Sequence, residues 1–319
     1  MRTSQLFPGA LVLFGWVTQA QQPACRATVL VTALDQKTNA PVDGLIAGDL
    51  LAKMKGRALA IRSMSPPPAA RRFVFVLDRS GSMVGVRNFD SGSIYDLDRR
   101  MKQDVEELLS EIPSGDSVAL LAFSGGQSTR TEFANPAIAR SELPAILAWK
   151  PGKGLQVHRT PLWANVEAAL QMLSPHKAGD VIVAVSDGHD NMSKLSKNKI
   201  QNDLLTSGVP ILAVMIANFY QPTMDGADDL RDFAGLADST GGAAAFGDSA
   251  LDTRFAMGAQ LLFPPNQLIL LLAHQYELEM ETPAIQKPEK WELKVNSTAA
   301  GGRLNLLYPR YLLPCAETH

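Results

Sequence analysis

Three oxygen-bearing side chains, Asp78, Ser80 and Ser82, follow a strongly apolar run at alternate positions. The run from Phe73 to Leu77 contains five apolar residues without a polar break, which is typical of a strand buried on both faces of a parallel sheet. Open α/β sheets bind ligands at the carboxyl ends of their strands. Hard oxygen donors on the turn after such a strand indicate a hard divalent cation, Mg²⁺ before a softer metal.

Two further oxygen donors can join this group. Asp187 comes shortly after the apolar stretch 181–185, as Asp78 follows the first run, and Thr160 stands at the start of an expected helix. If the two strands are neighbours, both carboxylates meet at one crevice. Two acids and three hydroxyls suit an octahedral cation that keeps a position for water or a ligand. The predicted metal ligands are therefore Asp78, Ser80, Ser82, Thr160 and Asp187.

The elements that would position these residues alternate between strand and helix. This alternation predicts an α/β fold with a doubly wound, mostly parallel sheet. The expected strands are 73–77, 118–123, 181–185, 209–217 and 243–246, with a short edge strand at 131–133. The expected helices are 96–112, 141–149, 161–173, 197–207, 229–237 and 251–263.

Both ends of the chain have a different pattern. Extended segments are expected at 28–34 and 57–64, and again at 268–280, 291–295 and 303–308, with no helix between the last three. Neither end has enough strands for a stable sheet alone. We therefore predict a small antiparallel β unit formed by both termini, into which the α/β domain is inserted. The predicted division is a signal peptide at 1–20, an N-terminal β segment at 21–65, the α/β domain at 72–263 and a C-terminal β segment at 266–319.

The first 20 residues resemble a secretory signal, with Arg2, a largely apolar stretch at 6–17 and small residues before a cleavage point after Ala20. A membrane anchor is the alternative, but the apolar stretch is too short to span a bilayer. We expect export to the periplasm, the cell surface or the medium, with no membrane span after cleavage. The formal net charge of −2 offers no basic surplus for nucleic acid or an anionic membrane.

The chain has two cysteines, Cys25 and Cys315. In an exported protein a disulfide is plausible, whereas two unpaired buried thiols are the alternative, and spacing alone does not decide. If the terminal strands meet, the two cysteines come within bridging distance, and a Cys25–Cys315 disulfide is the prediction.

The pattern Asp-x-Ser-x-Ser, a later Thr, and Ser-Asp-Gly after an apolar strand resembles the metal-ion-dependent adhesion site of von Willebrand factor type A (VWFA) domains, over about residues 72–263. The resemblance implies a Rossmann-like domain that binds Mg²⁺, or Mn²⁺ or Ca²⁺. It implies that Ser80 and Ser82 are direct ligands, and that Thr160, Asp78 and Asp187 bind directly or through water. The flanks, including Pro41–Leu45, are similar to exported bacterial VWFA-related proteins of the acidobacterial type.

The predicted donor set favours binding over catalysis. Because the donors are mostly neutral hydroxyls, a bound cation keeps net positive charge and attracts an acidic side chain. The resemblance likewise implies a protein ligand that offers Asp or Glu, and no enzyme activity. One alternative is a Mg²⁺-dependent, phosphatase-like hydrolase, but such enzymes of the haloacid dehalogenase type need a second Asp where this chain has Ser80. Another is a structural envelope protein with a stabilising cation.

Overall fold

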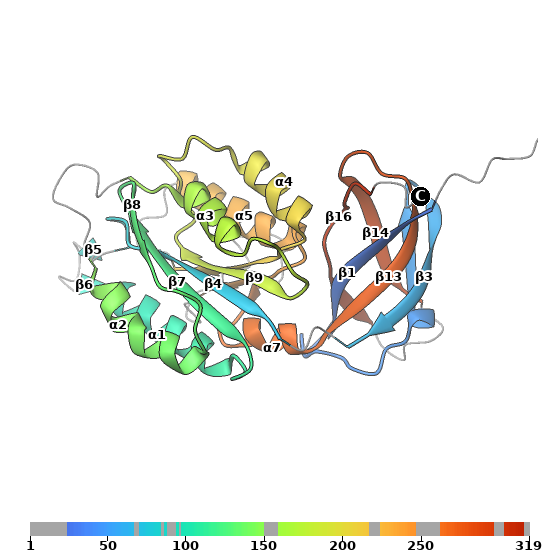
Figure 1. Ribbon diagram of the computed structural model, residues 1–319, viewed down its shortest axis with the longest axis horizontal. Coiled ribbons are helices and arrows are strands. Elements are labelled where there is room, and N and C mark those ends of the chain that lie inside the picture. Colours follow the sequence, from blue (N-terminus) through green and yellow to red (C-terminus); the bar gives the residue numbers. More distant parts are fainter. Residues whose placement is uncertain are drawn as a thin grey trace, which may run out of the picture.

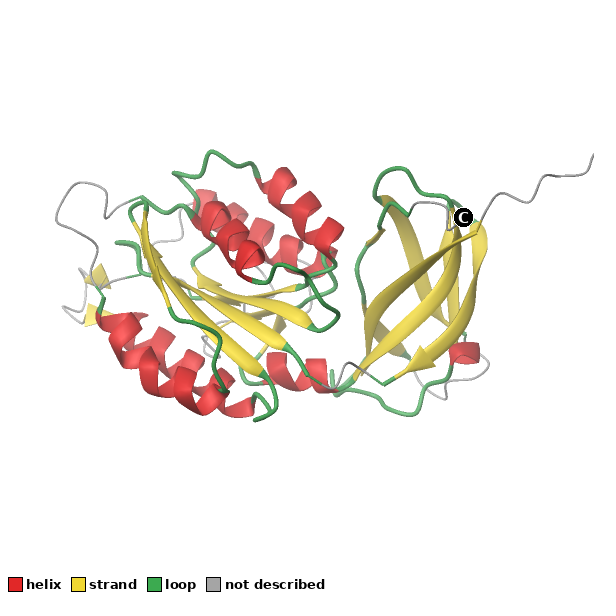
Figure 2. Cartoon of the chain, viewed as in Figure 1, coloured by secondary structure: helices red, strands yellow, loops and turns green. Residues whose placement is uncertain are grey.

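The computed structural model describes residues 24–66, 70–83, 86–87, 94–95, 97–149, 159–216, 224–246, 262–296 and 303–315. The expected signal peptide lies outside these residues. The described chain forms two seven-stranded sheets and a small two-stranded one. Figure 1 shows the two large sheets in separate lobes, and in Figure 2 helices flank one of them. No helix in the described part of the chain is both long and apolar enough to cross a membrane.

The central sheet has the strand order β12-β11-β10-β9-β4-β7-β8. All neighbouring pairs are parallel except β7 and β8, which are antiparallel. Its strands are β4 (Arg72–Asp78), β7 (Ser117–Ser124), β8 (Gln127–Arg130), β9 (Asp180–Ser186), β10 (Ile211–Met215), β11 (Ala244–Phe246) and β12 (Leu262–Phe263). The strands β5 (Val86–Arg87) and β6 (Ile94–Tyr95) form the two-stranded sheet.

Helices cover both faces of the central sheet. One face packs on α1 (Leu97–Glu111), α2 (Pro136–Ala148) and α7 (Gln267–Ala273). The other face packs on α3 (Leu162–Met172), α4 (Lys197–Ser207) and α5 (Met224–Ser239). In β4, Phe73 and Phe75 belong to the first core and Val74 and Val76 to the second, so the strand is buried on both sides. The predicted doubly wound α/β class is confirmed.

The second sheet combines the two ends of the chain in the order β15-β1-β13-β3-β2-β14-β16, and all its pairs are antiparallel. It contains β1 (Ala24–Asp35), β2 (Leu50–Met54), β3 (Arg57–Ser65), β13 (Gln275–Pro283), β14 (Glu289–Val295), β15 (Leu304–Leu307) and β16 (Tyr311–Leu312). A short 3-10 helix, η1 (Ala47–Asp49), precedes β2. β1 lies between β13 and β15, so this sheet is the antiparallel unit predicted from the two termini.

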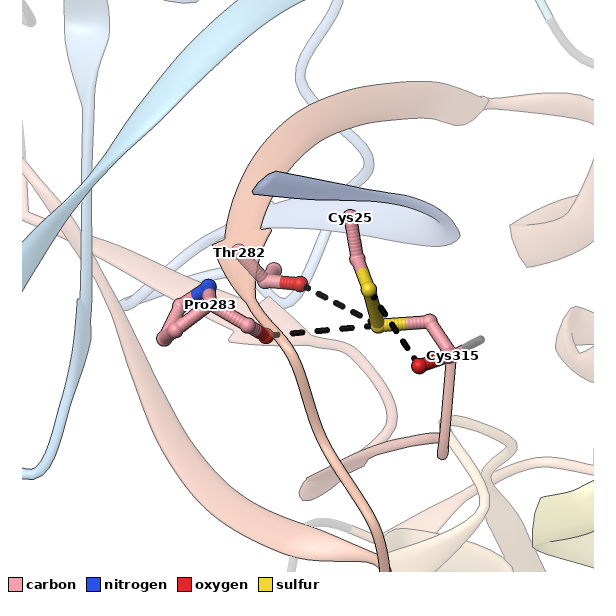
Figure 3. Close-up of a disulfide and its surroundings, with 4 residues drawn as sticks. All are labelled: Cys25, Thr282, Pro283 and Cys315. Carbon is pink, nitrogen blue, oxygen red and sulfur yellow. Dashed lines mark hydrogen bonds between the residues drawn. A yellow bond between two sulfur atoms is a disulfide. The ribbon is translucent and has the colours of Figure 1, made fainter. Parts of the chain in front are cut away.

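A disulfide joins the start of β1 to the segment after β16 (Figure 3). Cys25 of β1 is bonded to Cys315, and their Cα atoms are 6.0 Å apart. Thr282 of β13 lies opposite Cys25 in the sheet. The backbone N–H of Cys315 donates to the carbonyl oxygen of Ile285 at 3.0 Å. The predicted pairing of the two cysteines is therefore confirmed.

Three expected elements differ from the structure. The segment 268–280 is not extended throughout: the helix α7 comes first and β13 follows. Buried Leu268, Ile269, Leu271 and Leu272 pack α7 against the central sheet and α1, and a short apolar run does not distinguish helix from strand by periodicity. Residues 251–261 of the expected last helix lie outside the described residues, and 262–263 form β12 instead.

The edge strand expected at 131–133 is β8, at Gln127–Arg130. Gly125 and Gly126 both have positive φ angles, 56° and 83°. They form a two-residue hairpin turn of the kind that glycine pairs favour, so β8 begins directly after β7. The side chain of Thr131 instead accepts a hydrogen bond from the backbone N–H of Leu120 at 3.0 Å.

Candidate metal site at the carboxyl edge of the sheet

The two acids of the predicted site lie at the ends of neighbouring strands. β4 and β9 are parallel and adjacent, with Leu77 opposite Val185. Asp78 is the last residue of β4, and Asp187 follows Ser186 at the end of β9. Both carboxylates therefore stand at the carboxyl edge of the sheet, where ligands of open α/β sheets bind.

Asp78 is fully buried and holds the turn that follows it. Its Oδ1 accepts a hydrogen bond from the backbone N–H of Ser80 at 2.8 Å, and its Oδ2 accepts one from the Ser186 hydroxyl at 2.6 Å. The hydroxyls of Ser80 and Ser82 lie 3.1 Å apart. The structure thus brings Asp78 and both serines of the motif into one hydrogen-bonded group.

Buried Arg79, next to Asp78, has a Coulombic interaction with it, but the pKa of Asp78 is still raised. The pKa of Asp78 is raised from 3.8 to about 7, mainly by burial and secondly by the nearby negative charge of Asp187. The hydrogen bonds from Ser186 and Ser80 oppose this change without cancelling it. A cation between the two acids would reverse the effect, since an opposite charge favours the ionised carboxylate.

Thr160 is hydrogen-bonded to Asn191, which lies in the loop that follows Asp187. The backbone N–H of Thr160 donates to Asn191 Oδ1 at 2.7 Å, and the Thr160 carbonyl accepts from the Asn191 N–H at 3.1 Å. Thr160 is 2% exposed and lies two residues before α3 begins. These bonds place the Thr160 backbone beside the loop that contains Asp187.

The exposure of the five residues differs in a way that defines an open side. Asp78, Ser80 and Thr160 are buried, whereas Asp187 is partly exposed and Ser82 is exposed. A small ion held by this set would be covered on the side of the buried residues. It would be accessible to solvent and to a partner on the side of Ser82 and Asp187.

Several residues that support the site were not predicted. Ser186 binds the Asp78 carboxylate directly, and its hydroxyl also accepts from the Gly188 N–H at 3.1 Å. Asp190 Oδ2 accepts from the Trp163 N–H at 2.7 Å, at the start of α3. Ser193 Oγ accepts from the Ala164 N–H at 2.9 Å, so Ser193 also supports α3. The Ser-Asp-Gly sequence was a signal for Ser186, but nothing local indicated the contacts to α3.

His189 lies beside the site and forms an ion pair. Its Nδ1 is 2.6 Å from Asp229 Oδ2 on α5. Burial lowers the pKa of His189, but the hydrogen bond and charge of Asp229, with smaller contributions from Asp187 and Asp190, outweigh it and raise the pKa overall. His189 therefore ties this loop to α5.

The donor chemistry of the group fits a hard cation. In the described part of the chain, no three His, Cys, Asp or Glu side chains come together as a metal cluster. The predicted set depends instead on two carboxylates with serine and threonine hydroxyls, all of them hard oxygen donors. Such a set suits Mg²⁺ or a similar ion better than a soft metal.

Comparisons with known proteins bear on the fold. No family model matches the sequence, and no curated protein was found to be similar. Among solved structures, BatB from Bacteroides thetaiotaomicron is 16% identical and aligns with 64% of this chain and 98% of its own, with a TM-score of 0.42. The VWA domain of SpRpn10 is 13% identical over 63% of this chain and 93% of its own, with a TM-score of 0.38.

A third similar structure is the manganese-loaded TRAP protein of Plasmodium vivax, which is 12% identical over 78% of this chain and 97% of its own, with a TM-score of 0.42. Each of these likenesses concerns the fold alone. The parallel sheet with helices on both faces is the doubly wound α/β architecture that the resemblance to VWFA domains implied, and that architecture is confirmed.

Proposed function

We propose that the protein is an exported, metal-dependent protein-binding module without enzyme activity. A divalent cation, Mg²⁺ or a similar ion, would be held by Asp78, Ser80, Ser82, Thr160 and Asp187. Its chemistry would be to attract a carboxylate, so that an Asp or Glu side chain of a partner protein completes the coordination. The carrying observation is that Asp78, fully buried, stands beside a second acid and two serine hydroxyls without a positive charge sufficient to keep its pKa in the ordinary range.

The open side of the group favours partner capture over a purely structural ion. Ser82 and Asp187 are accessible to solvent, while Asp78 and Ser80 are not. An ion that served only to stabilise the fold would not need an accessible side. A phosphatase-like mechanism is less favoured because Ser80 stands where that chemistry needs a second carboxylate.

Calorimetry with Mg²⁺ or Mn²⁺ tests the metal site. The Asp187→Ala variant is expected to lose ion binding, because it removes one of two charged ligands. Asp203→Ala is a matched control: it also removes one acid, but from an exposed Lys199–Asp203 ion pair on α4. Equal ion affinity in wild type and Asp187→Ala would show that the ion is placed wrongly or that no such site exists.

Capture of an envelope protein tests the partner role separately. The mature chain should retain a binding partner from a native envelope fraction in Mg²⁺ and release it in EDTA. Asp187→Ala should retain none, whereas Asp203→Ala should behave as wild type. Ion binding without Mg²⁺-dependent capture would favour the structural role, and phosphate release from a general phosphatase substrate would favour the hydrolase.

A further inference from the structure

The first strand of the terminal sheet has one edge that is only partly covered. β1 pairs with β13 from Ala24 to Thr32, but on the opposite edge β15 covers only Thr32–Asp35. Within the described ranges, no strand pairs with residues 24–31 on that side. An edge of this kind presents N–H and C=O groups that can pair with another chain.

Hydrogen bonds at the end of β1 identify the residues that face the open edge. The Gln36 N–H donates to the Arg303 carbonyl on the β15 side at 2.9 Å, whereas the Ala33 carbonyl accepts from Val42 on the other side at 2.9 Å. Successive residues of a strand direct their backbone groups to opposite edges, and β1 pairs with β13 without a bulge. The backbone groups that point to the open edge therefore belong to Arg26, Thr28 and Leu30.

This open edge lines a groove between the two lobes. The groove has a volume of about 390 Å³, with residues 26–30 on one wall and 309–315 on the other. Its floor is formed by loops that precede β9, β10 and β11, including Gly179, Pro210 and Gly241. Figure 1 shows β1 on the side of the terminal sheet that faces the central lobe. Because the central lobe closes the far side, the groove admits a single strand rather than the edge of a second folded sheet.

We propose that this groove binds an extended peptide segment of a partner protein, which adds to β1 as a strand and carries an acidic side chain. The part of the open edge that lines the groove is residues 26–30, about 17 Å of extended chain. Arg26 and Lys177 are the cations of the lining, and Glu277 is its one acid. Arg26 is already in an ion pair with Glu279, whereas Lys177 is exposed and forms no ion pair with the described residues, so Lys177 is the contact for the acid. Main-chain hydrogen bonds to the edge supply affinity in this mode of recognition, and the side-chain contacts supply specificity.

The groove and the candidate metal site lie at opposite ends of the central sheet. The loops of the groove floor precede parallel strands, whereas Asp78 and Asp187 follow them. Peptide binding in the groove is therefore independent of the metal, and the two sites can be tested separately.

The experiment begins with random linear peptides displayed on phage, selected against the purified full chain in EDTA. The strongest selected peptide is then synthesised with a fluorescent label and its affinity measured by anisotropy. Thr28→Pro removes one outward N–H but none of the bonds to β13, and proline is tolerated at such edge positions. Thr28→Val is the matched control, because it changes the same side chain and keeps the N–H.

We expect the selected peptides to carry an acidic residue. Thr28→Pro should weaken binding about tenfold or more, because the peptide loses a backbone hydrogen bond and meets the proline ring. Thr28→Val and Asp187→Ala should bind within about twofold of wild type, and Lys177→Glu should weaken binding of the acidic peptide. Amide exchange on wild type provides a check that needs no variant: Arg26, Thr28 and Leu30 should gain protection when peptide binds. Failure to enrich any sequence, equal binding by Thr28→Pro, or protection at other amides only would overturn the proposal.

Discussion

The buried acid of the candidate metal site should make the ion-free protein less stable as pH rises. Asp78 is fully buried, and its pKa of about 7 in the folded chain compares with 3.8 for an ordinary aspartate. At about 1.36 kcal/mol per pKa unit, this difference lowers the free energy of unfolding by about 4 kcal/mol when the carboxylate is charged. The perturbation that isolates it is Asp78→Asn, which removes the charge and little else.

The direction follows from proton binding. Below about pH 4 the acid is protonated in the folded and the unfolded chain, so the loss is absent. Between about pH 4 and pH 7 the unfolded chain releases its proton while the folded chain keeps it, so stability falls as pH rises. Above about pH 7 the full loss remains. The Asp78→Asn variant should lack this component, because its amide oxygen can accept from Ser80 and its amide nitrogen can donate to Ser186.

Urea unfolding in EDTA at about pH 5 and about pH 8 measures the effect. Because the unfolded chain has already released most of its proton at about pH 5, the free energy of unfolding of wild type should fall by about 2.6 kcal/mol more than that of Asp78→Asn over this range. Asp104 on α1, whose pKa burial raises to about 6, titrates equally in both proteins and cancels from the difference. At about pH 8, Mg²⁺ at a hundred times its Kd should restore about 2.7 kcal/mol to wild type alone.

Two results would contradict this reasoning. If wild type and Asp78→Asn have the same pH dependence in EDTA, the buried carboxylate is neutralised by protein groups and needs no cation. If Mg²⁺ stabilises wild type as much at about pH 5 as at about pH 8, protons and the ion do not compete for Asp78, and the ion binds elsewhere.

Three further predictions concern the rest of the fold. Reduction of the Cys25–Cys315 bond should lower the free energy of unfolding by up to about 5 kcal/mol, since it opens a loop with a sequence separation of 290, and urea unfolding with and without reductant measures this. Arg72→Met should destabilise by about 3 kcal/mol in thermal unfolding, because it leaves the 2% exposed side chain of Asp180 without its ion-pair partner, while Arg72→Lys should lose less. Gly241→Ala should destabilise by about 2 kcal/mol, because φ is +80° and the added Cβ would lie 2.6 Å from a proline ring of the terminal sheet, whereas the open Gly115→Ala site should tolerate the change.

The strands that carry the candidate site were predictable because their sequences are apolar without a break. The run Phe73–Leu77 has no polar face and is rich in β-branched and aromatic residues, which favours a strand covered on both sides. Once two such strands are parallel neighbours, the residues at their ends must meet at one edge. The convergence of Asp78 and Asp187 therefore followed from the strand pattern and the direction of the chain only on the condition that the two strands are neighbours, which the structure shows.

The supporting contacts were not predictable because they join residues that are distant in sequence. Asn191 contacts Thr160 and Asp190 contacts Trp163 across the gap between the β9 loop and α3. Each is an ordinary polar residue in a loop, and only the packing of α3 on the sheet brings it to its partner. The helix α7 was missed for a similar reason, since its conformation depends on the core that it covers.

Contacts between the two lobes show where the two proposed binding sites lie relative to each other. Arg310, next to β16, forms an ion pair with Asp238 on α5 at 2.6 Å. The backbone N–H of Arg310 donates to the Ser239 carbonyl at 2.9 Å. Buried Arg71, just before β4, donates to the Leu272 carbonyl of α7 at 2.6 Å. These contacts lie toward the amino ends of the parallel strands, as the groove does, and leave the carboxyl edge free. A partner bound at that edge through a cation would therefore not obstruct a peptide strand on β1, and one molecule could hold two partners at opposite ends.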